Sequence, residues 1–202
     1  MIGPSFSLAS GARRFALPPL LAAIPLAVVA PPLGALALAL GGFVIWFFRD
    51  PERTPPPNGV VAPADGRISV VREEDGRIRV GVFMNVTDVH VLRAPMDGTV
   101  EAATHRPGAH RPAFTKESER NERVDVAFDT HDVSMIAGWF ARRIYPYCTA
   151  GDAVTRGDRI GHIAFGSRAD VLLPAAYDFG DLLVTEGDRV RAGETVVALR
   201  DT

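Results

Sequence analysis

The fold is decided in residues 157–173, which read GDRIGHIAFGSRADVLL. A Gly-Asp turn opens this stretch, and a strand-like apolar run follows it as far as Gly166-Ser167. The chain from residue 60 onward repeats this arrangement, with apolar runs of period two at residues 68–71, 78–83, 124–128 and 196–199 and Asp-Gly turns at 65–66, 75–76 and 97–98. No long amphipathic helical pattern occurs after residue 59. We therefore expect a mainly β domain, a partly closed sandwich or barrel of short strands.

Gly166-Ser167 is the only Gly-Ser pair in the sequence, and it can support self-cleavage. Because glycine lacks a Cβ atom, the carbonyl carbon of Gly166 is open to attack by the hydroxyl of Ser167. The attack converts the amide to an ester, and a base that removes the Cα proton of Ser167 then eliminates the ester. The chain is cut between residues 166 and 167, and the new terminus passes through dehydroalanine to a pyruvoyl group. The alternative is an ordinary turn, since Gly-Ser is a common turn pair.

Further motifs surround this pair in a fixed order: Pro63-Ala64-Asp65-Gly66, Asp88-Val89-His90-Val91, Arg93-Ala94-Pro95, Asn121-Glu122-Arg123-Val124, Phe165-Gly166-Ser167-Arg168 and Asp170-Val171-Leu172-Leu173-Pro174. Together they resemble the phosphatidylserine decarboxylase proenzymes of the short, archaeal type, over most of residues 60–200. The resemblance implies a pyruvoyl group that is generated from Ser167 and forms a Schiff base with phosphatidylserine. Carbon dioxide and phosphatidylethanolamine would be the products. It also implies two associated chains, residues 1–166 and 167–202.

Self-cleavage needs a base near Ser167, and a histidine held by a carboxylate is the usual solution at neutral pH. His90 lies in a strand-like segment, and Asp65 lies in an Asp-Gly turn at the start of a strand. Both match motifs of the family, so we expect Asp65 to orient His90 and His90 to activate Ser167. The alternatives are a structural histidine and a plain turn aspartate. Arg93 departs from the pattern, because longer bacterial members carry a second histidine there, and this leaves the final proton donor open.

The other four histidines are weaker candidates. His131 lies in a predicted turn, and His105 and His110 lie in a loop that contains proline and glycine. His162 is close to Ser167 in sequence, but five residues along a strand span about 16 Å. No two histidines have the spacing of a His-x-x-x-His site, and we predict no metal.

Residues 15–48 carry no charged side chain, and Pro31-Pro32 divides them into two apolar arms. As a helix, each arm would reach about 24 Å, which is less than the roughly 30 Å of the hydrocarbon core of a membrane. The stretch is therefore either one kinked span or a helical hairpin that returns to the same face. Arginines flank both ends and favour the hairpin, whereas a secretory signal peptide is the alternative.

Composition sets the remaining expectations. Residues 1–14 form a tail, residues 49–59 a proline-rich linker, and residues 60–202 the β domain. The single cysteine, Cys148, excludes an internal disulfide and indicates a reducing compartment. We expect a cell-membrane protein with its β domain on the cytoplasmic side. The net charge of -2 and the scattered basic residues argue against nucleic acid as a partner.

Two other classes of function fit the same fold. Gly-Asp turns at residues 151–152 and 187–188 resemble those of lipoyl and biotinyl carrier domains, which makes a noncatalytic, membrane-anchored carrier module the main rival. Such a carrier needs a lysine at a hairpin tip, and the one lysine, Lys116, lacks that sequence context. The third class is a noncatalytic membrane-anchored β domain in which Gly166-Ser167 is only a turn.

Overall fold

A computed structural model describes residues 7–109, 120–139, 143–165 and 167–200 of the chain. The chain divides into two compact units, Met1–Glu52 and Arg53–Thr202. The predictions for Gly166, His110 and Lys116 fall outside the described residues.

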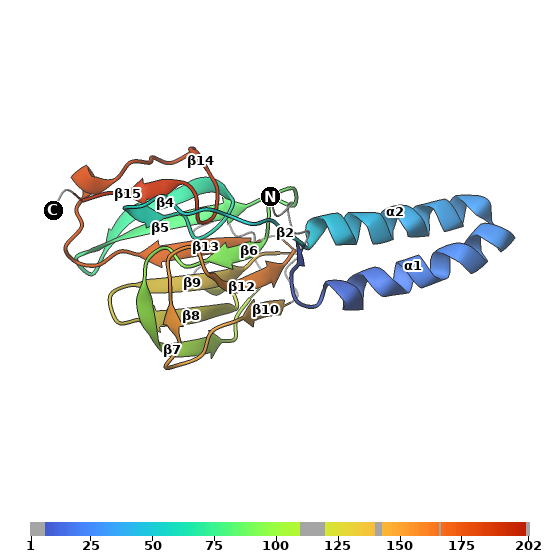
Figure 1. The fold of residues 1–202 in the computed structure, drawn as a ribbon, viewed down its shortest axis with the longest axis horizontal. Coiled ribbons are helices and arrows are strands. Elements are labelled where there is room, and N and C mark those ends of the chain that lie inside the picture. Colours follow the sequence, from blue (N-terminus) through green and yellow to red (C-terminus); the bar gives the residue numbers. More distant parts are fainter. Residues whose placement is uncertain (1–6, 110–119, 140–142, 166, 201–202) are drawn as a thin grey trace. The chain divides into compact units, whose positions relative to one another are not determined.

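The first unit is a helical hairpin (Figure 1). Helix α1 (Ala12–Val29) and helix α2 (Pro31–Phe47) lie side by side. Strand β1 (Ser7–Leu8), before α1, pairs with strand β2 (Arg49–Asp50), after α2, at the open end of the hairpin. Pro31 begins α2 at a position where its missing N–H is no loss. Gly34 packs against Ala27, with no room for a Cβ atom between the helices. The helix pair is therefore closely packed.

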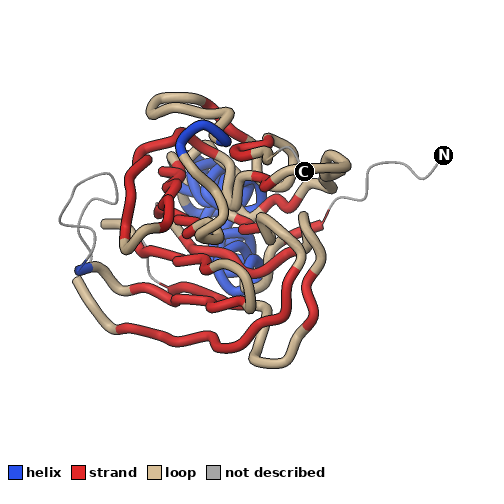
Figure 2. Tube along the Cα trace, turned by 90° about the vertical axis from the view of Figure 1, so that its left-hand side faces the viewer, coloured by secondary structure: helices blue, strands red, loops and turns tan. Residues whose placement is uncertain are grey.

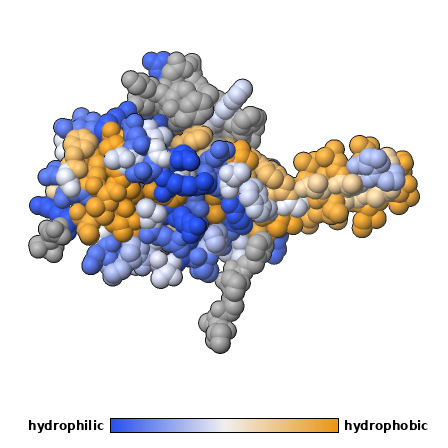
Figure 3. Space-filling view, turned by 90° about the horizontal axis from the view of Figure 1, so that it is seen from above, coloured by the Kyte–Doolittle hydropathy of each residue, from blue (hydrophilic) through white to orange (hydrophobic). Residues whose placement is uncertain are grey.

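The outer surface of this hairpin is mostly hydrophobic (Figure 3). Apolar side chains that point outward include Leu21, Ile24, Val28 and Val29, which are 72–85% exposed. Helix α1 is long and apolar enough to cross a membrane, whereas α2 has 17 residues and falls short of that length. Exposed apolar surface on this scale is typical of a segment that contacts lipid or another apolar partner.

The second unit consists of strands, as predicted (Figure 1). Its strands are β3 (Val60–Val61), β4 (Gly66–Glu74), β5 (Arg77–Met84), β6 (Val91–Arg93), β7 (Gly98–Arg106), β8 (Arg123–Phe128), β9 (Asp132–Ala137), β10 (Arg143–Pro146), β11 (Ala153–Val154), β12 (Arg159–Ala164), β13 (Ser167–Leu172), β14 (Arg189–Val190) and β15 (Val196–Ala198). The one helical element described in this unit is the short 3-10 turn η2 (Phe179–Asp181). The predicted mainly β fold is confirmed, whereas the likeness to lipoyl carrier domains stays a prediction.

Three sheets make up this unit. The largest has the order β11-β7-β8-β9-β13-β5-β4-β14 and curls into a half-barrel (Figure 2). A three-stranded sheet, β10-β12-β6, and the pair β15-β3 complete the architecture. The β4–β5 hairpin turns at Asp75-Gly76, where both residues have positive φ, as a tight two-residue hairpin turn requires. Strand β13 lies near the middle of the large sheet, although it comes late in the sequence.

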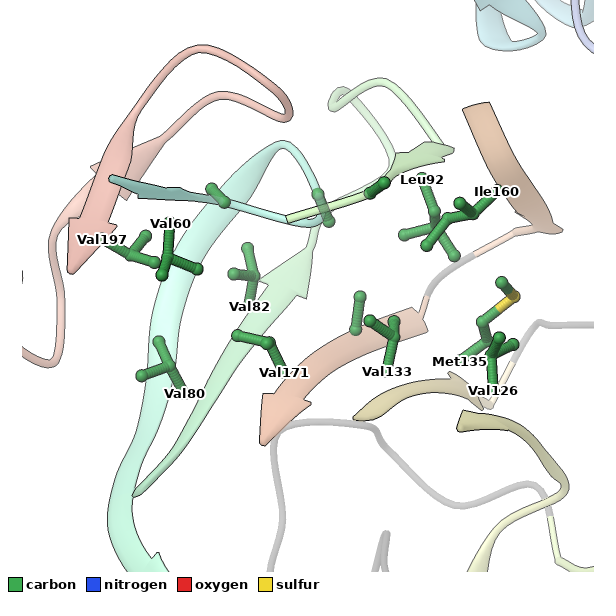
Figure 4. Packing of buried hydrophobic residues seen from close by; sticks show 14 of the residues in the cluster. Val60, Val80, Val82, Leu92, Val126, Val133, Met135, Ile160, Val171 and Val197 are labelled. Carbon is green, nitrogen blue, oxygen red and sulfur yellow. The ribbon is translucent and has the colours of Figure 1, made fainter. Parts of the chain in front are cut away.

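The core fills the space between these sheets (Figure 4). Side chains of the large sheet face those of the two smaller sheets, and the fully buried contributors include Val80, Val82, Val126, Val133, Met135 and Val171 on one side and Val60, Leu92, Ile160 and Val197 on the other. Each such side chain contributes about 1.5–3 kcal/mol when buried. This packing fixes β13 between β5 and β9, and it thereby fixes the start of β13.

Candidate active site at the start of strand β13

Ser167 is the first residue of β13, and it is fully buried. Its backbone pairs with Met84 of β5 on one side and with Ala137 of β9 on the other. The hydroxyl group has one acceptor among the described residues, the thioether sulfur of Met84 at 3.8 Å. Because a thioether is a weak acceptor, the hydroxyl is not held by a strong hydrogen bond. The serine is therefore fixed in position, while its oxygen is left available for reaction.

Phe165 has an unusual backbone conformation next to this serine. Its φ angle is 68°, and Asp75 in the β4–β5 turn is the other non-glycine residue with positive φ in the described part of the chain. The left-handed conformation costs an ordinary residue about 1–2 kcal/mol. Strand β12 ends at Ala164 and β13 begins at Ser167, so the chain passes from the small sheet to the large one here. Strain of this kind often marks a functional site.

His90 lies on a second connection between the same two sheets. This connection leaves β5 at Met84, opposite Ser167, and enters β6 at Val91. The carbonyl of His90 accepts a hydrogen bond from the N–H of Ile163 at 3.3 Å. The connection thus meets the β12–β13 segment at both of its ends. We call the described residues of this region, 84–91, 163–165 and 167, the junction; it contains both Ser167 and His90.

The ring of His90 is 3% exposed and is oriented by its own chain. Its Nδ1 atom lies 2.9 Å from the carbonyl oxygen of Asp88. An Nδ1–H donated to that carbonyl leaves Nε2 as the basic nitrogen of the neutral ring. The carboxylate of Asp88 accepts a hydrogen bond from the N–H of Asn85 at 2.8 Å, which closes the turn before His90. A basic nitrogen is thereby prepared in the junction.

Asp65 is held by Arg53 and Ala192, which lie outside the junction. Its carboxylate accepts a hydrogen bond from Arg53 at 2.8 Å and one from the N–H of Ala192 at 2.8 Å. Burial raises the pKa of Asp65, and the nearby charge of Asp88 raises it further. The hydrogen bond from Ala192 and the charge of Arg53 act in the opposite direction. The backbone of Asp88 orients His90, and the role that we predict for Asp65 in orienting that ring stays a prediction.

Arg93 is a buried structural residue. It is 4% exposed, and its Nη1 atom donates to the carbonyl of Gly157 at 2.9 Å. A Cβ atom added at Gly193, which has a φ of 71°, would come within 2.9 Å of the arginine stem. Since a guanidinium keeps its proton at any ordinary pH, Arg93 is a poor proton donor.

His162 borders the junction, although the sequence alone makes it a weaker candidate. On β12 it pairs with Val91 of β6 and with Tyr145 of β10, and its ring stacks on that of Tyr145 with centroids 4.5 Å apart. Burial, and then the charge of His90, lower the pKa of His162 to about 4. No spacing in the sequence reveals this neighbour of His90, because the pairing of β12 with β6 joins segments far apart in the chain.

The remaining predicted sites can be placed briefly. His131 lies in the loop between β8 and β9, and His105 lies on β7, 2.9 Å from Glu122. Among the described residues, no three His, Cys, Asp or Glu side chains are grouped so that they could hold a metal ion. The junction combines a buried serine, a residue with positive φ two positions before it, and a histidine whose Nδ1 lies against the carbonyl of Asp88. These features fit a pyruvoyl group made from Ser167.

Comparison with known proteins identifies the family of the chain. The model of the phosphatidylserine decarboxylase family matches residues 40–198. A putative archaetidylserine decarboxylase proenzyme of Halobacterium salinarum is 56% identical over 92% of this chain and 95% of its own length. A phosphatidylserine decarboxylase proenzyme of Streptomyces avermitilis is 47% identical over 93% of this chain and 91% of its own length. The chain belongs to the phosphatidylserine decarboxylase family.

Proposed function

We propose that this protein is a membrane-associated, self-processing decarboxylase that converts phosphatidylserine to phosphatidylethanolamine and carbon dioxide. Its membership of the family supports a decarboxylase. One observation carries the proposal of self-processing: Ser167 is fully buried as the first residue of a central strand, two residues after the strained Phe165.

Self-cleavage follows from the residues of the junction. The Oγ atom of Ser167 attacks the carbonyl carbon of Gly166, and the Nε2 atom of His90 takes the hydroxyl proton. The carbonyl of Asp88 holds the ring of His90 so that Nε2, and not Nδ1, is the base. In this proposal Asp65 helps to orient the ring of His90. His90 returns the hydroxyl proton to the nitrogen of Ser167 as the bond between that nitrogen and the carbonyl carbon of Gly166 breaks, which leaves an ester. The neutral ring then removes the Cα proton of Ser167, and the ester C–O bond breaks to leave a carboxylate on Gly166 and dehydroalanine at residue 167. Water hydrolyses the dehydroalanine to the pyruvoyl group and releases ammonia.

The two products of cleavage would stay together. Residues 167–202 contribute β13, which pairs with both β5 and β9, and β14 and β15, which pair with β4 and β3. All of these partners belong to the longer chain, residues 1–166. A short fragment with so many partners in the core of another chain can hardly separate from it. The pairing supports an associated two-chain enzyme.

The pyruvoyl group at residue 167 would condense with the primary amine of the substrate and accept the electrons that the departing carboxylate leaves behind. The residues of the protein do the rest. The low exposure of Ser167 and His90 keeps water from the start of β13, and in this proposal His90 holds the proton that the reaction needs. No metal ligand set is required for this chemistry.

The helical hairpin is proposed to attach the enzyme to the cell membrane, with the β domain on the cytoplasmic side. The pairing of β1 with β2 brings the two ends of the hairpin together, so both ends lie on the same side. Arg13, Arg14 and Arg49 lie near these ends, as the positive-inside rule predicts for a cytoplasmic side. The guanidinium of Arg49 lies 4.2 Å from the ring of Trp46, an arrangement suited to the membrane–water interface.

Decarboxylation can be tested directly on the purified chain in lipid vesicles. The vesicles would contain phosphatidylserine, archaetidylserine or, as a control, phosphatidylcholine, and both carbon dioxide and the ethanolamine lipid would be measured. We expect release from the serine lipids only, and none from the Ser167→Ala variant. A wild-type protein that is cut between residues 166 and 167 yet releases no carbon dioxide from either serine lipid would contradict the proposed activity.

A further inference from the structure

Strand β13 carries different side chains on its two faces. Ser167, Ala169 and Val171 face the core, and all three are fully buried. Because side chains alternate along a strand, Arg168 and Asp170 point to the opposite face. There they line a cavity of about 900 Å³ that extends over strands β4, β5, β7, β8, β9 and β13.

The charged pair on this opposite face is itself almost completely buried. The Nε and Nη2 atoms of Arg168 donate to the two carboxylate oxygens of Asp170 at 2.7 and 2.9 Å, and the two residues are 4% and 1% exposed. Asp170 lies 3.6 Å from Arg79 of β5, which in turn donates to Glu74 of β4 at 2.6 and 2.7 Å. A chain of ion pairs thus connects β13 with β5 and β4.

Strand β5 is shaped to receive this pair. A Cβ atom added at Gly81 would lie 2.7 Å from the Oδ1 atom of Asp170, so the glycine makes room for the carboxylate. Gly81 pairs directly with Asp170 in the ladder. The fit depends on register, because a shift of β13 by one residue would move the carboxylate away from the glycine.

Stability alone does not account for the pair. A buried ion pair loses so much hydration that apolar side chains of similar size often serve the fold equally well. Register is a better account, because a shift by one residue exchanges the two faces of a strand. The core face of β13 is only weakly apolar, with a serine, an alanine and a valine, so it specifies register poorly. Arg168 and Asp170 specify it strongly, since the shift would place both charges in the apolar core.

We propose that the Arg168–Asp170 pair fixes the register of β13 and thereby holds residue 167 on the core face of the junction, both before and after cleavage. This inference rests on the proposed self-cleavage. Once the bond before Ser167 is cut, β13 begins at a free end, and its pairing with Met84 and Ala137 must keep the reacting residue in place. Arg168 and Asp170 are positioning residues, because they act through the strand and not on the reacting atoms.

The test replaces the two charged side chains with apolar ones. The double variant Arg168→Met with Asp170→Leu should unfold at the same or a higher denaturant concentration than the wild type. Its rate of self-cleavage, measured by intact mass, should be about tenfold lower or more, because small displacements of the reacting groups reduce the rate strongly. The matched control is Arg106→Met with Asp125→Leu, which removes another ion pair, at 2.8 Å, between β7 and β8 of the same sheet and away from β13. The control should cleave at the wild-type rate.

A second readout does not depend on cleavage. In the uncleavable Ser167→Ala background, hydrogen exchange of the amides of residues 167–172 should be faster with the double variant than without it. Normal exchange together with cleavage at the wild-type rate would overturn the inference and leave the proposed function intact. A wild-type protein that never cleaves would instead refute the proposed function, while the exchange experiment would still report on register.

If the double variant fails to fold, Arg168→Lys decides the question. It keeps the positive charge but loses the planar two-pronged contact with Asp170. Slower cleavage at unchanged thermal stability would support the inference, and cleavage at the wild-type rate would overturn it.

Discussion

His131 and His162 lie in different parts of the second unit, but each is buried with its ring parallel to one aromatic ring. Both are 1% exposed. The ring of His131 lies parallel to that of Phe128, with centroids 4.4 Å apart, and the ring of His162 lies parallel to that of Tyr145 at 4.5 Å. Burial lowers the pKa of both histidines to about 4. The pKa therefore does not distinguish them.

Their neighbours do distinguish them. Asp132 and Asp129 act on the charge of His131, in the loop between β8 and β9, whereas the charge that acts on His162 is that of His90 in the junction. A strongly lowered histidine pKa thus reports burial. Only the position near His90 connects such a histidine with the proposed chemistry.

The largest difference is expected for the base itself. His90→Gln should slow self-cleavage by about 100-fold or more, because a general base contributes at least that much. His131→Gln is the matched control, and it should cleave at the wild-type rate. The measurement is the fraction of cut chain against time, by intact mass. Equal rates for the two variants would remove His90 from the mechanism.

The stability of the two sites should depend on pH in the same way. An unfolded histidine titrates near pH 6.5, whereas His131 and His162 titrate near 4 in the folded chain, so the unfolded chain binds more protons between these values. Their contribution is complete above about pH 6.5 and is lost as the pH falls towards 4. Denaturant unfolding of the Ser167→Ala chain should show this loss, and either His131→Gln or His162→Gln should reduce the slope by about one proton.

A carboxylate on the opposite face of the large sheet provides a control for this pH dependence. Hydrogen bonds from Arg79 lower the pKa of Glu74 from 4.5 to about 2. Its contribution is therefore present above about pH 4.5 and is lost only as the pH falls from there towards 2. Glu74→Gln should leave the decrease between pH 6.5 and 4.5 unchanged. A changed slope in that upper range would show that carboxylates, and not histidines, cause it.

A smaller effect should separate the two histidines in their own titration. The charge of His90 adds to burial in lowering the pKa of His162, whereas aspartates and Arg77 supply the charges that act on His131. In the Ser167→Ala background, His90→Gln should therefore raise the pKa of His162 above about 4 and leave the pKa of His131 unchanged, as measured by NMR titration. An unchanged pKa of His162 would show that His90 does not act on it.

The smallest effect concerns the hydroxyl groups that face the two rings. Nδ1 of His162 lies 2.7 Å from the hydroxyl of Tyr147, and Nδ1 of His131 lies 3.0 Å from that of Thr130. Tyr147→Phe should lower the free energy of unfolding by about 1 kcal/mol, and Thr130→Val by no more than that. Tyr145→Phe, which keeps the stacked ring, is the control. A larger loss for Thr130→Val than for Tyr147→Phe would show that these distances do not rank the two hydrogen bonds.

The sequence was sufficient for the local features of the fold. The predicted strands at residues 68–71, 78–83, 124–128 and 196–199 lie in β4, β5, β8 and β15, because alternating apolar residues and Asp-Gly turns act over a few residues. The family was also predictable, since its motifs are contiguous stretches.

The long-range features of the site were not predictable. The place of His162 depends on the pairing of β12 with β6, and the burial of Arg168 and Asp170 depends on β13 lying between β5 and β9. The partners of Asp65 come from Arg53 and Ala192, which are distant in sequence from each other. Spacing in one sequence does not encode such pairings. The positive φ of Phe165 likewise depends on the passage from one sheet to another.

The central claim, that Ser167 becomes the pyruvoyl terminus of a second chain, is tested most directly by intact mass. The wild-type protein should give two chains, residues 1–166 and 167–202, and the shorter should be about 17 Da lighter than a serine terminus would make it, because one ammonia is lost. The Ser167→Ala protein should give one chain. A single uncut chain in both samples would contradict the account.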